Sequence, residues 1–302
     1  AFENAAAKLR DLGLHAGMTP LDARLAPFLA WLADQVAVME TSDEELPGTF
    51  RRFEAVLVTA RLVAIMGYAP PAVSRCLSAR LDTLYELAET GNHDIYIDQD
   101  TFGDYPNNSF RKKPLVDPQL NGQLPSIHDI YALAYAPTDM LNTANRDKID
   151  AVINYVMHPD YQALRDGYGV MRAGPRRYYA IGWSVHLPGY DGDFELERTP
   201  TATLVQRLEL MAHFPTARRH RWFGEALAHL ETFREEVAGD ITVYRFPPSY
   251  LRESAGGYWV TGAYMRLEDN RRRPIALTLD STFRMAYLQH LLRSTTPGAP
   301  HL

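Results

Sequence analysis

The sequence predicts an all-helical protein, either an α/α toroid of helical hairpins or an irregular helical bundle, with long loops and a few short strands. Apolar residues recur at helical spacing over most of the chain. Pro and Gly stand where helices begin and end, and short turns join successive helices. Strands and helices do not alternate regularly, which argues against a parallel-sheet protein. We expect one domain over residues 1–302, with a frayed tail from about residue 294.

Three helices are expected at the start of the chain, over residues 19–39, 49–66 and 71–89. Thr19 can act as an N-cap, and Pro20 suits the first helical turn. Gly67 and Gly91 follow the second and third helices, where a left-handed residue commonly ends a helix. The short connections favour antiparallel neighbours.

The middle of the chain adds long loops to the helices. Residues 91–125 are rich in Pro, Asp and Asn, and loops of this length are often functional. Ser126 and Asp129 have the spacing of a capping box, which opens a helix through about Ala134. Further helices are expected over residues 145–157, 175–186, 201–214, 217–237 and 281–292. Between residues 242 and 279 the sequence is richer in Tyr, Pro and Gly and predicts short extended segments.

The composition narrows the functional classes. The chain has 31 Lys and Arg against 37 Asp and Glu, a formal charge of -6, so we expect no general nucleic-acid binding. Cys76 is the only cysteine, which excludes an intrachain disulfide and any site with two thiolates. Arg61 interrupts the best apolar run, so no transmembrane segment is expected. The beginning of the chain lacks signal-peptide features, which predicts a cytoplasmic protein; the absent initiating Met leaves a removed leader open.

Carboxylates provide the candidate catalytic groups. Neighbouring carboxylates repel one another, so one of them can keep a proton and act as a general acid, or the group can hold a cation. The residues that we select for this role are Asp98, Asp100, Asp129 and Glu253. No metal-ligating residue is assigned, and the cofactor stays open, a divalent cation included.

Aromatic and basic residues provide the candidate substrate-binding groups. At 3.6 residues per turn, Tyr179, Trp183 and His186 would share one face of the helix expected over residues 175–186. The other candidates are two arginines at the start of that helix, suited to a phosphate or carboxylate, and two loop aromatics, suited to a sugar or a carbocation: Arg176, Arg177, Tyr258 and Trp259.

A short motif resembles one of class II terpene cyclases. The segment Asp98-Gln99-Asp100-Thr101 is similar to the Asp-rich acid motif of that family, without its second consecutive Asp. The paired helices with long aromatic loops resemble the toroids of terpene cyclases and protein prenyltransferases. The resemblance implies that Asp100 protonates an alkene.

The leading hypothesis is therefore an enzyme, a lyase or isomerase, that binds a prenyl substrate in a central aromatic and acidic cavity. One alternative is a glycan-active toroid enzyme that uses paired carboxylates. The other is a non-catalytic helical module that binds a partner protein through its aromatic and Arg surfaces. The oligomeric state is left open.

Overall fold

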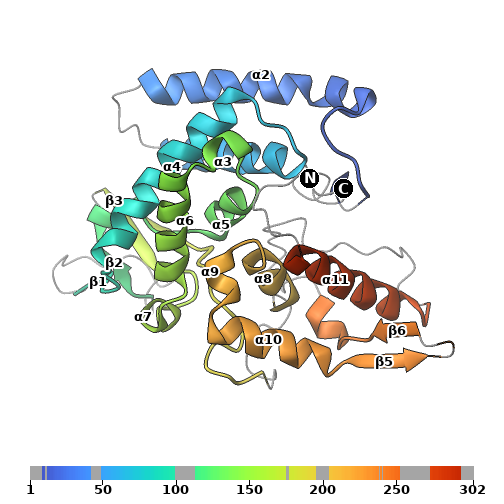
Figure 1. The fold of residues 1–302 in the computed structure, drawn as a ribbon. Helices are drawn as coiled ribbons and strands as arrows, with labels where there is room; N and C mark the ends of the chain where they lie inside the picture. Colours follow the sequence, from blue (N-terminus) through green and yellow to red (C-terminus); the bar gives the residue numbers. More distant parts are fainter. Residues whose placement is uncertain are drawn as a thin grey trace. The chain divides into compact units, whose positions relative to one another are not determined.

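A computed structural model describes residues 9–10, 12–41, 49–98, 113–174, 177–194, 204–237, 239, 241–251 and 273–293. The described chain is mostly helical with a few short strands, which confirms the coarse fold class (Figure 1). It divides into two compact units. The sheet unit comprises residues 24–64 and 69–186, and the hairpin unit comprises residues 1–23, 65–68 and 187–302. The single domain and the toroid stay predictions.

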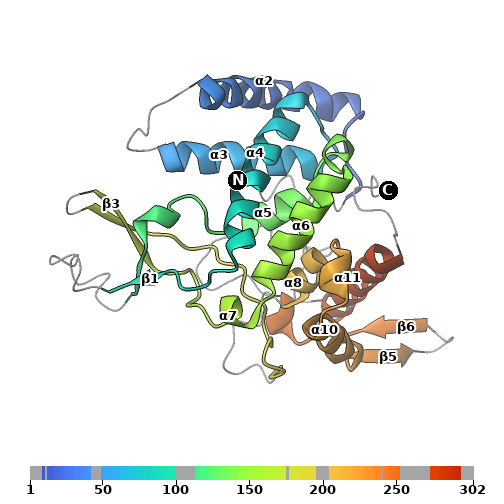
Figure 2. The same ribbon diagram turned by 60° about the vertical axis from the view of Figure 1, so that its left-hand side comes forward.

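The sheet unit is built around helix α4 (Pro71–Thr90). Pro71 occupies the first turn, and Gly91 ends the helix in the left-handed conformation with φ 62°. Figures 1 and 2 show α4 beside α3, α5 and α6, and it packs against α5 and α6. The helices of the unit are α2 (Thr19–Thr41), whose first residues belong to the hairpin unit, α3 (Thr49–Ile65), α4, α5 (Ile127–Ala134), α6 (Thr143–Val156) and α7 (Pro159–Gln162), with 3₁₀ turns η2 (Pro118–Leu120) and η3 (Thr138–Met140).

The capping box at the start of α5 is confirmed. Ser126 Oγ accepts a hydrogen bond from the Asp129 backbone N–H at 3.3 Å, and an Asp129 carboxylate oxygen accepts from the Ser126 N–H at 2.7 Å. These hydrogen bonds satisfy two backbone N–H groups at the start of α5, which lie inside the unit and away from water. The local sequence therefore fixes where α5 begins.

A small mixed sheet completes the unit. Its strands are β1 (Tyr96–Ile97), β2 (Leu115–Val116), β3 (Val170–Gly174) and β4 (Arg177–Ala180), in that spatial order. β2 and β3 are parallel, and the other pairs are antiparallel. The register sets Tyr179 opposite Met171.

The hairpin unit packs helices against a two-stranded ribbon. α11 contacts β6 and α8. A buried ion pair joins α8 to α11, with Glu209 Oε2 and Arg284 Nη1 3.4 Å apart. Its elements are α8 (Leu204–Met211), α9 (Pro215–Arg218), α10 (Arg221–Glu231), β5 (Arg234–Val237), β6 (Ile241–Tyr244), the 3₁₀ turn η5 (Pro248–Leu251) and α11 (Ala276–Arg293).

The prediction of a helix over residues 175–186 is wrong. Residues 177–180 form β4, and the chain continues as a loop. Arg177, Tyr178 and Tyr179 pair with β3, and aromatic residues suit a strand that has such a neighbour. Positive φ values at Gly182 and Trp183 then prevent a right-handed helix. Tyr179 and Trp183 therefore do not share a helix face. They line the same cavity because Tyr179 lies in β4 and Trp183 lies in the loop that follows it.

The prediction of one helix over residues 217–237 is wrong at both ends. Residues 215–218 form the separate short helix α9, and α10 begins at Arg221. α10 ends at Glu231, and residues 234–237 form an exposed strand paired with residues 241–244. Gly239 has φ 87° between these strands, a conformation that glycine adopts without steric cost. The final helix begins at Ala276, five residues before its predicted start.

None of the helices in the described part of the chain combines the length and the apolar character that crossing a bilayer requires.

Candidate functional site around Trp183

A cavity of about 40 Å³ lies inside the sheet unit, between α4, the start of α5 and the loop after β4. Its wall is mainly apolar and aromatic, with contributions from Leu57, Leu124, Tyr168, Met171, Tyr179 and Trp183. Two charged side chains, Arg80 and Asp129, also line it. A site needs about 10–15 Å³ of such space to hold one water molecule, so the cavity admits water.

The charged part of the wall is a bidentate ion pair. Arg80 Nε lies 2.7 Å from Asp129 Oδ1, and Arg80 Nη2 lies 2.8 Å from Asp129 Oδ2. Ser126 adds its N–H at 2.7 Å and its hydroxyl at 2.9 Å to Oδ2. Burial by itself would raise the pKa of the Asp129 carboxyl, but the attraction of Arg80 and these hydrogen bonds hold it below its usual value. Asp129 is therefore a fully paired carboxylate, and this arrangement does not support a general-acid role for it.

Arg80 also fixes the loop before α5. Its guanidinium donates to the carbonyl oxygens of Gly122 and Leu124, the latter at 3.1 Å. A planar guanidinium holds its donors in a rigid fork. The Arg80 side chain therefore connects α4 both to this loop and to Asp129 of α5. Arg80 positions the cavity wall.

Tyr168 forms the second polar chain at the cavity. Its hydroxyl donates to the Pro125 carbonyl, so in the 2.5 Å contact with the Tyr161 hydroxyl the donor is Tyr161. Tyr161 in turn accepts from the Val185 N–H at 3.1 Å. Burial, followed by the neighbouring Tyr161, raises the pKa of Tyr168 well above its usual value. The Tyr168 phenol stays neutral, and both tyrosine hydroxyls have hydrogen-bond partners.

The loop after β4 contributes Ile181, Gly182 and Trp183 to the cavity wall, and all three residues are partly buried. Gly182 and Trp183 have φ values of 76° and 58°. The left-handed conformation costs a residue with a side chain about 1–2 kcal/mol, and such strain is concentrated at functional sites. Ile127, at the start of α5, holds the strained residue by donating its N–H to the Trp183 carbonyl at 2.8 Å. The indole packs edge-on against the buried His128 ring, with 4.9 Å between the centroids.

The structure brings three of the predicted site residues, Asp129, Tyr179 and Trp183, to this cavity. Asp98 is exposed beyond β1 and does not line it. Arg177 is described through its backbone in β4. The other predictions, Asp100, Arg176, Glu253, Tyr258 and Trp259, lie outside the described residues.

His186 belongs to a separate polar group. Its Nδ1 lies 2.8 Å from Ser184 Oγ, its Nε2 lies 2.6 Å from the Leu164 carbonyl oxygen, and Asp166 Oδ1 lies 3.0 Å from Ser184 Oγ. A serine beside a histidine and an aspartate suggests a nucleophile. Ser184, however, is 3% exposed and accepts the Gly167 N–H, so it has no open approach for a substrate. This group fastens the loop after β4.

Arg80 and Tyr168 line the cavity but are not among the predicted site residues. A signal existed for Arg80, because it interrupts the buried apolar face of α4 between Leu77 and Leu84, where an unpaired charge would be costly. Tyr168 lies between Gly167 and Gly169 and takes φ 59°, which its own side chain does not favour. Its role depends on tertiary contacts alone.

Among the described lining residues, Asp129 is the one side chain of a metal-ligating type, and its oxygens are already occupied. The described lining residues therefore leave no carboxylate available to bind an ion. Comparison of the chain with protein-family models, curated proteins and solved structures gives no significant match.

Proposed function

We propose that the chain is an enzyme of the prenyl-substrate class, in which an apolar, unsaturated end of the substrate enters the cavity beside Trp183. The observation that carries the proposal is a strained, partly buried tryptophan that lines a cavity whose charged groups are already paired. Aromatic faces attract positive charge, which suits a developing carbocation. The toroid arrangement and the protonation of an alkene by Asp100 belong to the same proposal.

The chemistry of the wall favours a prenyl group over a glycan. Asp129 accepts four hydrogen bonds, and the Tyr179 hydroxyl is bound to Asn121 at 2.7 Å. Sugar hydroxyls need partners with spare hydrogen-bonding capacity, and an unpaired polar group is costly when buried. An apolar group needs only dispersion contacts and escape from water.

The size of the cavity requires Trp183 to move on binding. A cavity that takes benzene measures about 150 Å³, whereas this one measures about 40 Å³. Release of the left-handed backbone at Trp183 would offset part of the cost of displacing the indole. Substrate binding and a change in the surroundings of Trp183 are therefore coupled in this proposal.

A fluorescence titration of the full chain with prenyl diphosphates, prenyl alcohols and oligosaccharides tests this coupling. We expect a saturable change in tryptophan emission with the prenyl compounds, and its loss in Trp183→Phe. Trp31→Phe is the matched control, because Trp31 is an exposed tryptophan on α2 and does not line the cavity. An equal response in both variants, or a response to oligosaccharides alone, would contradict the proposal.

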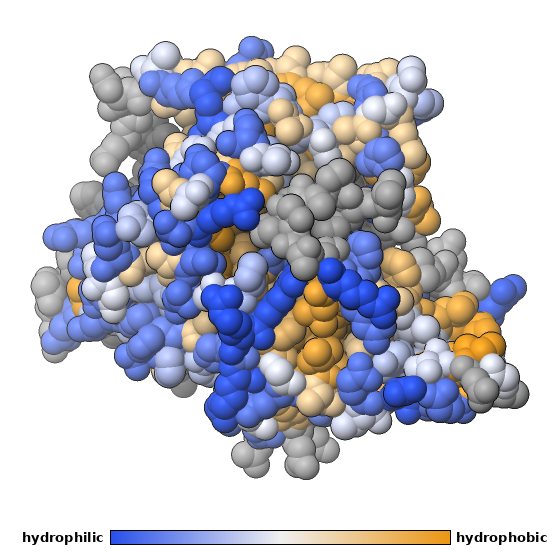
Figure 3. Space-filling model, viewed as in Figure 1, coloured by the Kyte–Doolittle hydropathy of each residue, from blue (hydrophilic) through white to orange (hydrophobic). Residues whose placement is uncertain are grey.

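A specific observation favours the protein-interaction alternative. Phe28, Trp31 and Val38 are about 40% exposed and, at helical spacing, share one face of α2. Figure 3 shows tan and orange side chains along α2 at the top of the view. Exposed apolar stripes of this kind often mark interaction surfaces. Failure of every small-molecule class to bind, with self-association or partner binding lost in Trp31→Ser, would support this alternative.

A further inference from the structure

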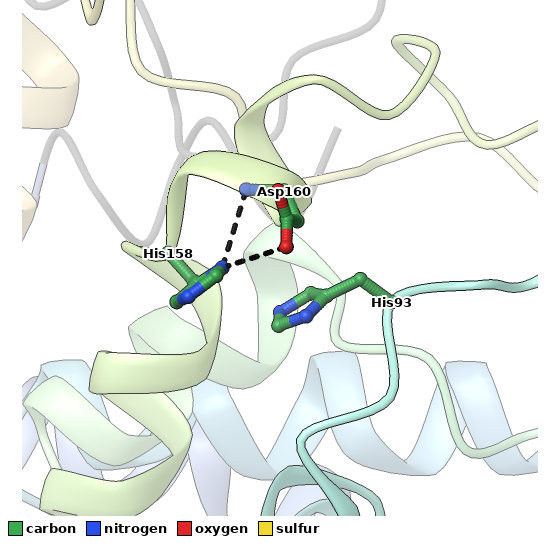
Figure 4. A group of neighbouring side chains, drawn as sticks. All are labelled: His93, His158 and Asp160. Carbon is green, nitrogen blue, oxygen red and sulfur yellow. Dashed lines mark hydrogen bonds and ion pairs between the residues drawn. The ribbon is translucent and has the colours of Figure 1, made fainter.

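Two imidazoles and one carboxylate converge in the sheet unit, at a place that the cavity does not use. His93 precedes β1, His158 is the N-cap of α7, and Asp160 lies in the first turn of α7. One ligand atom from each lies within 4.8 Å of those of the other two. Figure 4 shows the three side chains facing a common space. Among the residues that the structure describes, no other three His, Cys, Asp or Glu side chains meet this condition.

The His93 ring is held in place by stacking on both faces and by one hydrogen bond. It stacks on the Tyr155 ring at 4.3 Å and on the His158 ring at 4.7 Å. Its Nε2 lies 3.3 Å from the Tyr155 carbonyl oxygen, which can only accept a hydrogen bond. Nε2 therefore carries the proton, and the lone pair is on Nδ1. Metal-binding histidines commonly show this pattern, in which the second ring nitrogen donates to a carbonyl.

The His158 and Asp160 side chains already lie at a distance that two ligands of one ion could have. His158 Nδ1 accepts the Asp160 backbone N–H at 3.2 Å, so this nitrogen also presents a lone pair. Asp160 Oδ2 lies 3.6 Å from the same nitrogen. A tetrahedral ion with ligands at about 2.1 Å separates them by about 3.4 Å. The His158–Asp160 distance thus already matches a bound ion, and an ion at Nδ1 would replace one long hydrogen bond.

We propose that His93, His158 and Asp160 bind a divalent transition-metal ion of the zinc type. Two imidazole nitrogens select such an ion over Mg²⁺ or Ca²⁺, which prefer oxygen ligands. The His93 and His158 rings lie nearly parallel, with 15° between their planes, so one ring must rotate to direct its nitrogen at a shared ion. The His158 and Asp160 side chains are 50% and 73% exposed and have room for that rotation. Three protein ligands leave a fourth position for water or a small anion, as in catalytic rather than structural zinc sites.

The inference is independent of the proposed prenyl function. None of the three ligands lines the cavity around Trp183. Loss of metal binding and loss of prenyl binding are thus separate outcomes in separate variants.

Calorimetric titration of the metal-free full chain with Zn²⁺ tests the site, and Co²⁺ absorption reports its coordination number. We expect one ion per chain, and binding at least tenfold weaker in His93→Phe, which keeps an aromatic ring in the stack, and in Asp160→Asn, which keeps the side-chain shape. His15→Gln is the matched control, since His15 is an exposed histidine of the hairpin unit. It should bind like the wild type.

Three results would overturn the proposal: no binding at one ion per chain, wild-type affinity in both ligand variants, or equal competition by Mg²⁺. Asp160→Asn keeps the test decisive if His93→Phe fails to fold, because circular dichroism of this near-isosteric variant should match that of the wild type.

Discussion

Replacement of Asp129 by Asn isolates the charge of the buried ion pair. The variant keeps the side-chain shape and one oxygen that can accept the Ser126 N–H. It removes the negative charge opposite Arg80, whose side chain is only 8% exposed. Arg80 then remains as a buried cation without its carboxylate.

The expected loss of stability is large. Removing one partner of a buried ion pair costs about 3–5 kcal/mol, whereas exposed pairs contribute about 0–1 kcal/mol. Total stabilities of domains are about 5–15 kcal/mol. Asp129→Asn should therefore lower the free energy of unfolding of the sheet unit by about 3–5 kcal/mol.

The pH dependence has a defined sign. The pKa of Asp129 is lower in the folded protein than in the unfolded chain, where it is about 3.9. The stabilisation is therefore present above about pH 4 and is lost as the pH falls through the folded value. The wild type should lose this contribution in acid, and Asp129→Asn should not.

Urea unfolding between pH 3 and 7 measures these effects, with circular dichroism as one probe and hydrogen exchange of α4 and α5 as a probe of the sheet unit. The double variant Arg80→Met, Asp129→Asn completes a mutant cycle. We expect its cost to fall below the sum of the single costs by about 2–3 kcal/mol. Additive costs, or a cost under about 1 kcal/mol for Asp129→Asn, would refute the reasoning.

Two further predictions concern backbone space and thiol reactivity. Gly169→Ala should destabilise the protein by about 1–3 kcal/mol in urea unfolding, because its Cβ would lie within 3 Å of the Pro114 carbonyl oxygen. Gly224→Ala, in the interior of α10 with open space around it, should instead stabilise by about 0.5–1 kcal/mol; the same sign for both variants would contradict this contrast. Burial raises the pKa of the Cys76 thiol to about 11, so a disulfide reagent at pH 8 should label it only after unfolding, and rapid labelling of the native protein would show that α4 is not packed as described.

Local signals predicted the helices that depend on local chemistry. α4 has its proline in the first turn and its glycine at the end, and the Ser126–Asp129 box begins α5 where expected. The errors fall where a partner strand decides the structure. Residues 177–180 and 234–237 read as helix, yet β3 and β6 supply hydrogen-bond ladders to them. Propensity carries no information about such a partner, because the partner lies elsewhere in the chain.

The sequence predicted some of the residues that line the cavity but not how they are brought together. Asp129, Tyr179 and Trp183 were selected and do line one cavity, but the helix that was to align the two aromatics does not exist. His93 and His158 are 65 residues apart and meet only through the packing of the segment before β1 against α7. Sequence spacing could not reveal that pair.

The start of α5 connects the buried charge to the strained tryptophan. Asp129 pairs with Arg80 and also accepts a hydrogen bond from the backbone N–H of Ser126, the N-cap of α5. This second bond fixes the direction of the first N–H groups of the helix. One of these, from Ile127, holds the Trp183 carbonyl and with it the left-handed backbone of the cavity wall. Loss of the Asp129 charge should therefore loosen Trp183 as well as lower stability, since the strain at Trp183 persists only while its surroundings hold it. The ion pair would then act on ligand binding through the shape of the wall rather than by donating a proton.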